Sequence, residues 1–422
     1  MFKSIRGTKD IFIPEILRWQ KLEEVVHRIM KNYNFYEIRT PIFEETSLFA
    51  RGIGNETDIV SKEMYTFTDK SNQSLTLKPE MTASVARAFI QHNLGELKPI
   101  NKFYYISPMF RQERPQAGRL RQFHQVGAEI FGVKDYFADG ELIILANELL
   151  YELNVKNLKL DLNSVGCDKC RPKYIKKLKD YFYEVKDQLS EESQRRLEKN
   201  TLRILDSKDE RDIKFKIEAP SILEHLCDEC KSHYEHLKDF LVRNRINFNE
   251  NKNLVRGLDY YTKTAFEFTS SDLGAQDAIC GGGRYDLLVE QLGGKPTPGV
   301  GWACGIERIL LASEKYNDTP KPSVDCYLIF LSNELKEKLF SLATDLRKNN
   351  ISCDIDLLDR SLKAQMREAN RSNAKFALII GEDEFVDKKV IVKNLMTGLQ
   401  EKIALDKVVE YLSQELGING KN

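Results

Sequence analysis

The sequence predicts an α+β protein with a helical insertion, followed by a small separate α/β domain. Three observations predict this organisation. Strand-like and helix-like segments are mixed up to about residue 315, and a Lys/Glu-rich segment of helical periodicity interrupts them at 165–250. A linker with two prolines follows at 316–323, and after it strands alternate with helices, which is typical of a largely parallel sheet. We therefore expect one domain at 1–320, containing the insertion, and a second at 321–422.

Composition narrows the class of protein. The chain has 422 residues, with 64 Lys and Arg against 64 Asp and Glu, so its formal net charge is zero. This balance excludes a uniformly basic protein that coats nucleic acid, and any polyanion must bind at a local patch. No apolar run approaches the roughly 18 residues of a membrane span, and no apolar signal core follows the N-terminal charges. We expect a cytoplasmic protein without a membrane partner.

The first elements follow from local patterns. Pro14 suits a first helical turn, and apolar residues then recur at helical spacing until 32–34. A short extended piece is expected next, at 36–38. Polar residues 70–73 predict a turn between strands at 63–69 and 74–78. The other segments before the insertion are a helix at 80–93, strands at 101–107 and 122–132, and a helix at 140–153.

The remaining elements follow the insertion. The first group comprises strands at 253–257, 265–270 and 278–283 and helices at 285–292 and 305–314. Beyond the linker, the alternation predicts strands at 326–331, 352–357 and 376–380, helices at 334–349, 361–373 and 405–416, and a hairpin around 386–389.

The loop between the strands at 101–107 and 122–132 is strongly charged. It carries Arg111, Arg114, Arg119 and Arg121 against a single acid, Glu113. Guanidinium forks match pairs of phosphate oxygens, so this composition suits a polyphosphate ligand. The aromatic residue directly after the loop, at 123, suits stacking on a base. A solvated loop and a core phenylalanine are the structural alternatives.

A second polar cluster precedes the strand at 265–270. Arg256, Asp259, Tyr260 and Tyr261 lie within six positions, which suits a small polar ligand, although an ordinary turn has a similar composition. The glycines at 281–283 permit a close backbone approach or a sharp turn. They form neither a Walker loop nor a dinucleotide fingerprint, because no Gly-Lys-Ser/Thr follows and the spacing is wrong.

Two CxxC pairs lie near the ends of the insertion, Cys167 with Cys170 and Cys227 with Cys230. Paired CxxC units are typical of structural zinc when the fold brings them together. Free thiols and oxidised pairs are the other interpretations.

A basic stripe is expected in the C-terminal domain. Arg360, Lys363, Arg367 and Arg371 share one face if this segment is helical. Such a stripe fits either a solvated face or a contact with a nucleic-acid backbone.

Several segments, taken in order, resemble the histidyl-tRNA synthetases, a family of class II aminoacyl-tRNA synthetases, and the similarity runs along essentially the whole chain. RTPIFEETSLF (39–49) resembles motif 1, residues 110–132 resemble motif 2, and GVGWACGIERIL (299–310) resembles motif 3. Residues 254–268 and 278–286 resemble the two segments specific to the histidine enzymes.

The resemblance implies an α+β class II catalytic domain, with an antiparallel sheet of about six or seven strands flanked by helices. It also implies the helical insertion, a C-terminal α/β anticodon-binding domain, and a homodimer formed through the motif 1 region around Pro41. The implied activity is that of a histidine–tRNA ligase. Such an enzyme activates L-histidine with ATP and Mg²⁺ to histidyl-adenylate and transfers the histidyl group to the 3′ end of tRNA(His).

Positions that match the family motifs receive roles by resemblance. The implied catalytic cations are Arg111, Arg256 and Arg308. The implied ATP-binding residues are Arg111, Glu113, Arg119, Arg121, Phe123 and Arg308. The implied histidine-binding residues are Glu80, Thr82, Arg111, Gln125, Glu129, Arg256, Tyr260 and Tyr261. The implied tRNA contacts are Arg114, Gln116, Arg360, Lys363, Arg367 and Arg371.

Two other functions fit parts of the pattern. A non-catalytic paralogue that regulates histidine biosynthesis would bind histidine or a phosphate partner without charging tRNA. Such subunits typically lack the C-terminal domain and lose motif arginines, whereas this chain keeps Arg111, Arg256 and Arg308. A plain tRNA-binding module would not need the polar cluster at 256–261. The pattern therefore favours the ligase.

Overall fold

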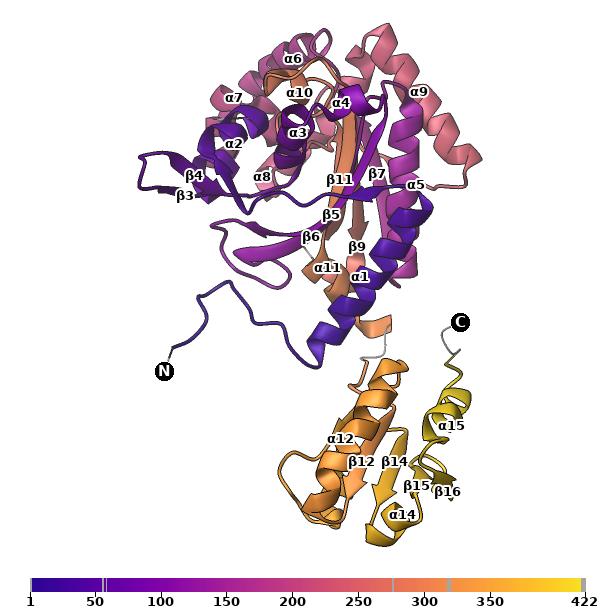
Figure 1. Cartoon of the computed structure of the whole chain (residues 1–422). Helices are drawn as coiled ribbons and strands as arrows, with labels where there is room; N and C mark the ends of the chain where they lie inside the picture. Colours follow the sequence, from indigo (N-terminus) through magenta and orange to yellow (C-terminus); the bar gives the residue numbers. More distant parts are fainter. Residues whose placement is uncertain (1, 55–56, 58, 275–276, 317–319, 419–422) are drawn as a thin grey trace. The chain divides into compact units, whose positions relative to one another are not determined.

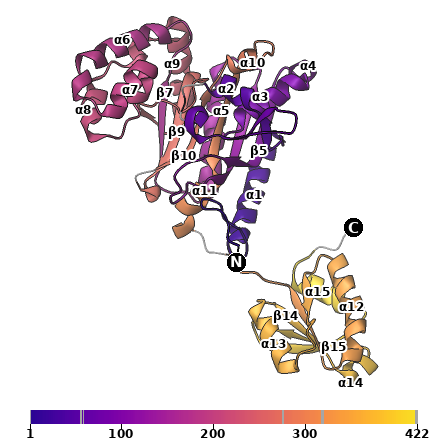
Figure 2. The same cartoon turned by 90° about the vertical axis from the view of Figure 1, so that its left-hand side faces the viewer.

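The computed structural model describes residues 2–54, 57, 59–274, 277–316 and 320–418. The chain forms two compact units, one built mainly from residues 19–318 and the other mainly from residues 319–422. Figures 1 and 2 show a large sheet surrounded by helices in the first unit and a small sheet with its own helices in the second. Among the described residues, no helix has the length and apolar character needed to cross a membrane.

An eight-stranded sheet forms the centre of the first unit, in the order β1-β5-β6-β11-β10-β9-β7-β8. Its six inner strands pair antiparallel, as the resemblance implies. The two-residue edge strands β1 and β8 pair parallel to their neighbours and bring the total to eight. The strands are β1 (Tyr36–Glu37), β5 (Asn101–Phe110), β6 (Gln122–Phe131), β7 (Leu158–Ser164), β8 (Asn249–Glu250), β9 (Thr262–Ser270), β10 (Ala278–Arg284) and β11 (Gly299–Gly305).

Helices cover this sheet where the sequence places apolar stripes. The predicted first helix is confirmed as α1 (Glu15–Asn32), which buries Trp19, Leu22 and Val26 at helical spacing. α5 (Tyr136–Glu152) is apolar on most sides, because it packs between the sheet and a helix of the insertion. The other helices of this part are α2 (Thr46–Ile53), α3 (Thr82–Gln91), α4 (Leu94–Leu97), α10 (Leu288–Gln291) and α11 (Ile306–Ala312).

A buried ion pair fastens α5 to the end of β10. Asp139 and Arg284 are both fully buried, and Arg284 Nε donates to Asp139 Oδ2 at 3.1 Å. Burial alone would raise the pKa of Asp139, but the guanidinium outweighs it and holds that pKa well below its usual range. The carboxylate therefore stays ionised and paired, which fixes the sheet end next to the residues described below.

The segments flanking the large sheet contain one confirmed and one wrong prediction. The expected hairpin around the turn at 70–73 is confirmed as β3 (Tyr65–Thr68) and β4 (Ser74–Leu77), which form a small sheet with β2 (Phe43–Glu45). The strand predicted at 253–257 is wrong, because these residues form turns and coil. Asn163 Nδ2 donates a hydrogen bond to Leu254 O at 2.9 Å, so a side chain, and not a neighbouring strand, pairs with this backbone carbonyl.

The insertion is helical, as predicted, and has its own core. Tyr174, Leu178 and Phe182 of its first helix are buried in that core. Its helices are α6 (Arg171–Glu184), α7 (Glu191–Lys199), α8 (Glu210–Glu218) and α9 (Asp228–Arg243). The last residues of the segment 165–250 return to the main sheet as β8, so the helical part ends before residue 249.

The second unit has a five-stranded sheet in the order β13-β12-β14-β15-β16. Its strands are β12 (Cys326–Phe330), β13 (Cys353–Ile355), β14 (Phe376–Ile380), β15 (Lys389–Asn394) and β16 (Gln400–Ala404), and its helices are α12 (Asn333–Lys348), α13 (Leu362–Arg371), α14 (Glu382–Val386) and α15 (Val408–Glu415).

Two expectations for this unit are wrong in part. Only β13, β12 and β14 are parallel, while β15 and β16 run antiparallel. The five-residue α14 between β14 and β15 is too short for a parallel crossover, which needs a dozen or more residues. The hairpin predicted around 386–389 lies instead between β15 and β16, where Gly398 has φ +77° and Asn394 Oδ1 accepts from two backbone amides.

Candidate active site

A pocket opens on the large sheet where β6, β10 and β11 meet the charged hairpin at 111–121. The structure brings seven of the predicted residues to its walls: Arg111, Glu113, Arg119, Phe123, Gln125, Arg256 and Arg308. Arg121 is not among the lining residues, since its backbone amide donates to Gly7 O at 2.7 Å and its side chain lies against that glycine. Residues 111 and 308 are far apart in the sequence, and the antiparallel pairing brings them together.

The hairpin side of the pocket is a cation–carboxylate group next to an aromatic ring. The guanidinium of Arg111 lies 5.2 Å from the centre of the Phe123 ring, and its Nε donates to Pro79 O at 2.9 Å. The carboxylate of Glu113 lies 3.7 Å from Arg111 and 3.4 Å from Arg119. Arg111 is thus held in place by groups on both sides, as a fixed cation must be.

Arg256 lies on the floor of the pocket. It forms an ion pair with Glu267 of β9, and its guanidinium lies 5.9 Å from the centre of the Tyr261 ring. Burial alone would lower the pKa of Arg256, but the Glu267 carboxylate outweighs it and raises that pKa, so the charge is permanent. Its Nε is buried with no hydrogen-bond partner among the described residues. One donor of a fixed cation is therefore available to a ligand.

Arg308 supplies a further cation from α11. Its Nε donates to Ala278 O at 2.6 Å, which anchors the side chain at the start of β10. Burial and the nearby charge of Arg119 lower the pKa of Arg308. Two guanidinium groups that repel each other across a pocket are stabilised by an anion that binds between them.

A buried polar cluster lies beside these cations, built on Glu80 and Glu129. Both carboxylates are buried, and the Thr82 hydroxyl donates to Glu129 at 2.8 Å while the Thr82 amide donates to Glu80 at 2.8 Å. The Tyr285 hydroxyl donates to the second oxygen of Glu129. Burial raises the pKa of both carboxyls, that of Glu129 to about 8. The cluster therefore holds two acids whose charge is disfavoured without a cationic or hydrogen-bonding ligand.

Two tyrosines connect the acids with Arg256. Tyr260 and Tyr261 are buried with ring centres 4.8 Å apart, and the Tyr260 hydroxyl donates to Glu80 at 3.4 Å. The amide oxygen of Gln125 is buried with no partner in the described structure. This part of the site thus offers acceptors to a small polar ligand, next to the cations that suit a phosphate.

Glycines in β10 and β11 make room for these side chains. A Cβ at Gly281 would collide with the guanidinium of Arg256, and a Cβ at Gly301 would collide with the carboxylate of Glu129. The close approach expected from the glycines at 281–283 is therefore present, and it serves side chains of this chain.

The side chains that hold Glu129 and Arg256 in place were not predicted from the sequence. Tyr285 and Tyr105 both donate to Glu129, and Glu267 pairs with Arg256. Tyr285 directly follows the glycine-rich strand β10. Tyr105 and Glu267 lie inside apolar strand patterns, where only the register reveals which neighbours they face.

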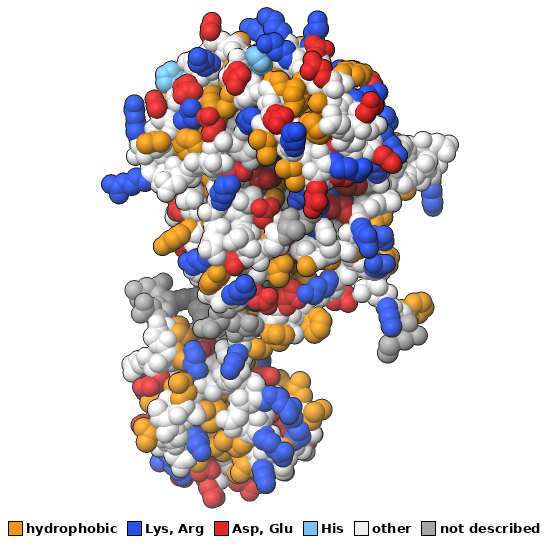
Figure 3. Space-filling view, turned by 180° about the vertical axis from the view of Figure 1, so that it is seen from behind, with side chains coloured by type: hydrophobic (Ala, Val, Ile, Leu, Met, Phe, Trp, Pro, Cys, Tyr) orange, Lys and Arg blue, Asp and Glu red, His pale blue; other side chains and the backbone are white. Residues whose placement is uncertain are grey.

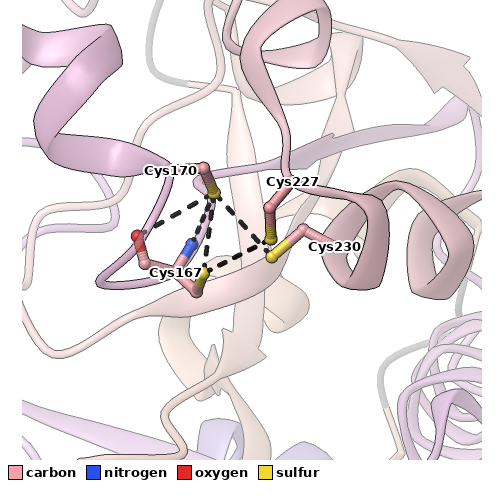
Figure 4. Close-up of side chains that lie close together, drawn as sticks. All are labelled: Cys167, Cys170, Cys227 and Cys230. Carbon is pink, nitrogen blue, oxygen red and sulfur yellow. Dashed lines mark hydrogen bonds between the residues drawn. The ribbon is translucent and has the colours of Figure 1, made fainter.

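The four predicted cysteines come together at one point of the first unit (Figure 4). Cys167 and Cys170 precede α6, and Cys227 and Cys230 lie at the start of α9. Neighbouring sulfurs are 3.7–3.8 Å apart and all four lie within 4.8 Å of one another. A disulfide requires about 2.05 Å, so the structure contradicts oxidised pairs, and these four cysteines are free thiols.

The predicted basic residues of the second unit differ in their surroundings. Arg360 precedes α13 and pairs with buried Asp356 at 2.7 Å and with Glu368 at 3.1 Å. Lys363 and Arg367 are exposed on α13, and Arg371 lies 3.5 Å from Glu368. Figure 3 shows Lys and Arg side chains gathered along one side of this unit. In the hairpin of the first unit, Arg114 and Gln116 are exposed.

Comparisons with known proteins agree with this architecture. Residues 7–309 match the family model described as histidyl-tRNA synthetase, and residues 325–415 match an anticodon binding domain. The chain is 49% identical over 409 residues to a histidine–tRNA ligase of Caldanaerobacter subterraneus, covering 96% of this chain and 98% of that protein. It is 47% identical over 419 residues to one from Halothermothrix orenii, covering 98% and 99%.

A solved structure agrees at the level of the whole chain. The apo histidyl-tRNA synthetase of S. aureus is 37% identical, with a TM-score of 0.82, over 98% of this chain and 100% of that one. Fold and matched domains define an aminoacyl-tRNA synthetase, a ligase of the antiparallel-sheet class. The chain belongs to the histidyl-tRNA synthetase family.

We expect Glu129→Gln to flatten the pH dependence of stability. Because burial raises the pKa of Glu129 to about 8, the folded chain keeps a proton that the unfolded chain releases near its ordinary pKa of about 4.3. Unfolding then releases a proton between these values, so stability falls as pH rises through about 4.5 to 8. Melting curves at about pH 5 and pH 8 measure this effect. The variant gains on the wild type at the higher pH, and equal slopes for both proteins would contradict the assignment.

Proposed function

We propose that this chain is a histidine–tRNA ligase, which activates L-histidine with ATP and Mg²⁺ and transfers it to the 3′ end of tRNA(His). The observation that carries the proposal is a pocket lined by fixed guanidinium groups, with a buried acid–tyrosine cluster next to it that Arg256 contacts through the Tyr261 ring. The first suits a triphosphate and the second a small polar amino acid.

The rival function, a regulatory paralogue, shares the fold. A structure titled as an ATP phosphoribosyltransferase regulatory subunit/histidyl-tRNA synthetase, from Bacillus halodurans, is 21% identical with a TM-score of 0.65 over 90% of this chain. That likeness concerns the fold alone. The arginines in the pocket and the match of 325–415 to an anticodon binding domain favour the ligase.

Activation needs charge stabilisation and positioning more than an ionisable base. The carboxylate oxygen of histidine forms a bond to the α-phosphorus of ATP, and the bond from that phosphorus to the diphosphate leaving group breaks. Negative charge builds on the phosphoryl oxygens, which fixed cations and Mg²⁺ stabilise. We assign Arg256 to the α-phosphate and the histidine carboxylate, and Arg111 and Arg308 to the phosphates. Arg119, which lines the pocket, assists the triphosphate. The resemblance gives Arg121 the same role, for which its side chain would have to leave its position against Gly7.

The residues that surround the phosphate-binding arginines suit the adenine of ATP on one side and histidine on the other. Phe123 offers a ring for stacking and Glu113 an acceptor for the adenine amino group. Glu80, Thr82 and the unpaired oxygen of Gln125 suit the α-amino group of histidine. We assign the imidazole to Glu129, Tyr260 and Tyr261, because a buried acceptor excludes apolar side chains of similar size that would leave it unpaired.

The transfer step requires tRNA at both units. We place the boundary between the catalytic and anticodon-binding domains at residues 320 and 321. Lys363, Arg367 and Arg371 of α13, with Arg360, are the proposed backbone contacts in the second unit, and Arg114 and Gln116 those near the catalytic pocket. The exposed positions of Lys363 and Arg367 support this role. The salt dependence of tRNA binding, compared between alanine variants of α13 and the wild type, measures how many phosphate contacts these residues make.

A homodimer through motif 1 completes the proposal. Phe43 and Phe67, in the small sheet next to Pro41, are 50% and 44% exposed and pack edge to face against each other. Exposed aromatic pairs of this kind are typical of an interaction surface, and the resemblance of residues 39–49 to motif 1 assigns that surface to a second copy of the chain. Sedimentation of the purified protein measures its oligomeric state. A cytoplasmic location remains a prediction from the sequence.

The cysteine cluster fits a structural zinc ion. A tetrahedral zinc with Zn–S bonds of about 2.3 Å places its sulfurs about 3.75 Å apart, and the neighbouring sulfurs here are 3.7–3.8 Å apart. Cys167, Cys170, Cys227 and Cys230 would hold the metal, and it would link the starts of α6 and α9. Such a site contributes to folding and not to the chemistry of activation.

Elemental analysis tests the zinc site. The purified protein is expected to contain about one zinc ion per chain, and Cys227→Ser is expected to lose it and to melt at a lower temperature. Cys353→Ser, which removes a thiol from the second unit, is the matched control and keeps the metal. Purified protein that contains no zinc and whose melting temperature does not rise when zinc is added would rule the site out.

Arg256→Ala tests the activation site. Loss of a fixed cation at the α-phosphate is expected to lower histidine-dependent ATP–pyrophosphate exchange roughly 100-fold or more. Arg256→Lys restores part of the rate, because an ammonium is a point charge and not a fork. The control is Arg28→Ala, whose exposed guanidinium pairs with Glu152. Unchanged exchange in folded Arg256→Ala would refute the assignment.

A further inference from the structure

The chain bulges where it enters β9, directly after the two active-site tyrosines. Gly283 pairs with Ala265 while the next residue, Arg284, pairs with Thr262. The two intervening residues of β9 therefore have no partner on β10, and one of them, Lys263, has φ +49°. A residue with a side chain adopts this conformation only when its surroundings hold it there. The direction of the Tyr260 and Tyr261 rings thus depends on what holds 262–264.

One support comes from the first CxxC pair. Arg171 directly follows Cys170, and its backbone amide donates to Cys167 O at 2.9 Å. Its guanidinium donates from Nε to Val165 O at 2.9 Å and from Nη2 to the carbonyl of Tyr261. The turn that carries Cys167 and Cys170 therefore sets the position of the Arg171 guanidinium, which is hydrogen-bonded to the backbone carbonyl of Tyr261.

A second support comes from the other CxxC pair. Glu229 lies between Cys227 and Cys230, and its carboxylate is 3.0 Å from the ammonium of Lys263. The Lys263 side chain is only 7% exposed, so this carboxylate is a necessary partner for its charge, together with Asp286 at 3.7 Å. The stabilisation of the Lys263 charge at the bulge thus depends on Glu229 at the start of α9.

The backbone of the bulge is tied to the same region. The amide of Lys263 donates to Gly166 O at 2.9 Å, and the amide of Val165 donates to Lys263 O at 2.7 Å. Gly166 in turn precedes Cys167 and lies against Cys170. The contacts made by Arg171, Glu229, Gly166 and Val165 with residues 261–263 therefore all start within two residues of a cysteine of the cluster, while Arg284 and Asp286 hold the same segment from β10 and the residues after it.

We propose that the four-cysteine cluster, closed by zinc, acts as a clasp that positions Tyr260 and Tyr261 for histidine. Arg171 and Glu229 belong to different helices, α6 and α9, and the cluster fixes these two helix starts relative to each other (Figure 4). Arg171, Glu229 and Lys263 are then positioning residues, which act through the tyrosines. The inference rests on the proposed function, both for the zinc ion and for the histidine-binding role of the tyrosines.

Matched variants test the clasp in the full-length protein, with histidine and ATP affinities measured separately by calorimetry. Arg171→Met and Lys263→Met are each expected to weaken histidine binding about tenfold or more and to leave ATP affinity within about twofold. Lys134 provides the control, because it lies 3.4 Å from the same Glu229 carboxylate but is 71% exposed and outside the bulge. Lys134→Met is expected to change neither affinity.

The comparison separates positioning from general stability. A merely structural role would lower the melting temperature of Arg171→Met without a selective change in histidine affinity. Folded Arg171→Met and Lys263→Met proteins that bind histidine as the wild type does would overturn the proposal.

Zinc removal gives an independent test whose outcomes distinguish the clasp from the proposals beneath it. Histidine is titrated into the protein as purified, after chelation and after zinc is added back, with zinc content measured in each sample. Weakened binding after chelation, restored by zinc, supports the clasp. Loss of zinc with unchanged histidine affinity overturns the clasp and leaves the zinc site intact. Wild-type protein that binds no histidine at all would refute the proposed function itself, and with it the clasp.

Discussion

The active site depends on the missing side chains of two glycines in neighbouring strands. Arg256 occupies the space over Gly281 of β10, and Glu129 occupies the space beside Gly301 of β11. β10 and β11 pair in the middle of the antiparallel sheet, where hydrogen bonds on both sides hold the backbone rigidly. A cation and an acid can therefore each pack directly against the backbone of a rigid sheet, with little freedom to move.

This sheet supports two electrostatic environments side by side. Towards the hairpin, Arg111, Arg119 and Arg308 surround a space that favours anions, and the permanent charge of Arg256 marks its border. Beyond that border, burial raises the pKa of Glu80 and Glu129, which favours a ligand that donates hydrogen bonds or carries a positive charge. An amino acid that presents its carboxylate to one side and its amino group and ring to the other matches this division.

Local sequence patterns predicted elements better than they predicted partners. Helical periodicity was enough for α1 and the helices of the insertion, and the polar turn at 70–73 was enough for its hairpin. The sequence does not predict β11 as a strand, because three of its seven residues are glycines, which are disfavoured in strands. The four cysteines and the arginines were found as residue types, but Tyr285 and Glu267 were missed, since only the register of distant strands brings them to Glu129 and Arg256.

The rate of histidine-dependent ATP–pyrophosphate exchange by the Gly281→Ala variant tests most directly whether the site depends on these two glycines. The added methyl group would occupy the place of the Arg256 guanidinium, and we expect a folded protein whose exchange rate falls roughly 100-fold, as for loss of the cation itself. Gly52→Ala is the control, since its Cβ would meet side chains only at ordinary contact distances of 3.4 Å or more, and it keeps the wild-type rate. A folded Gly281→Ala protein with wild-type exchange would contradict the account.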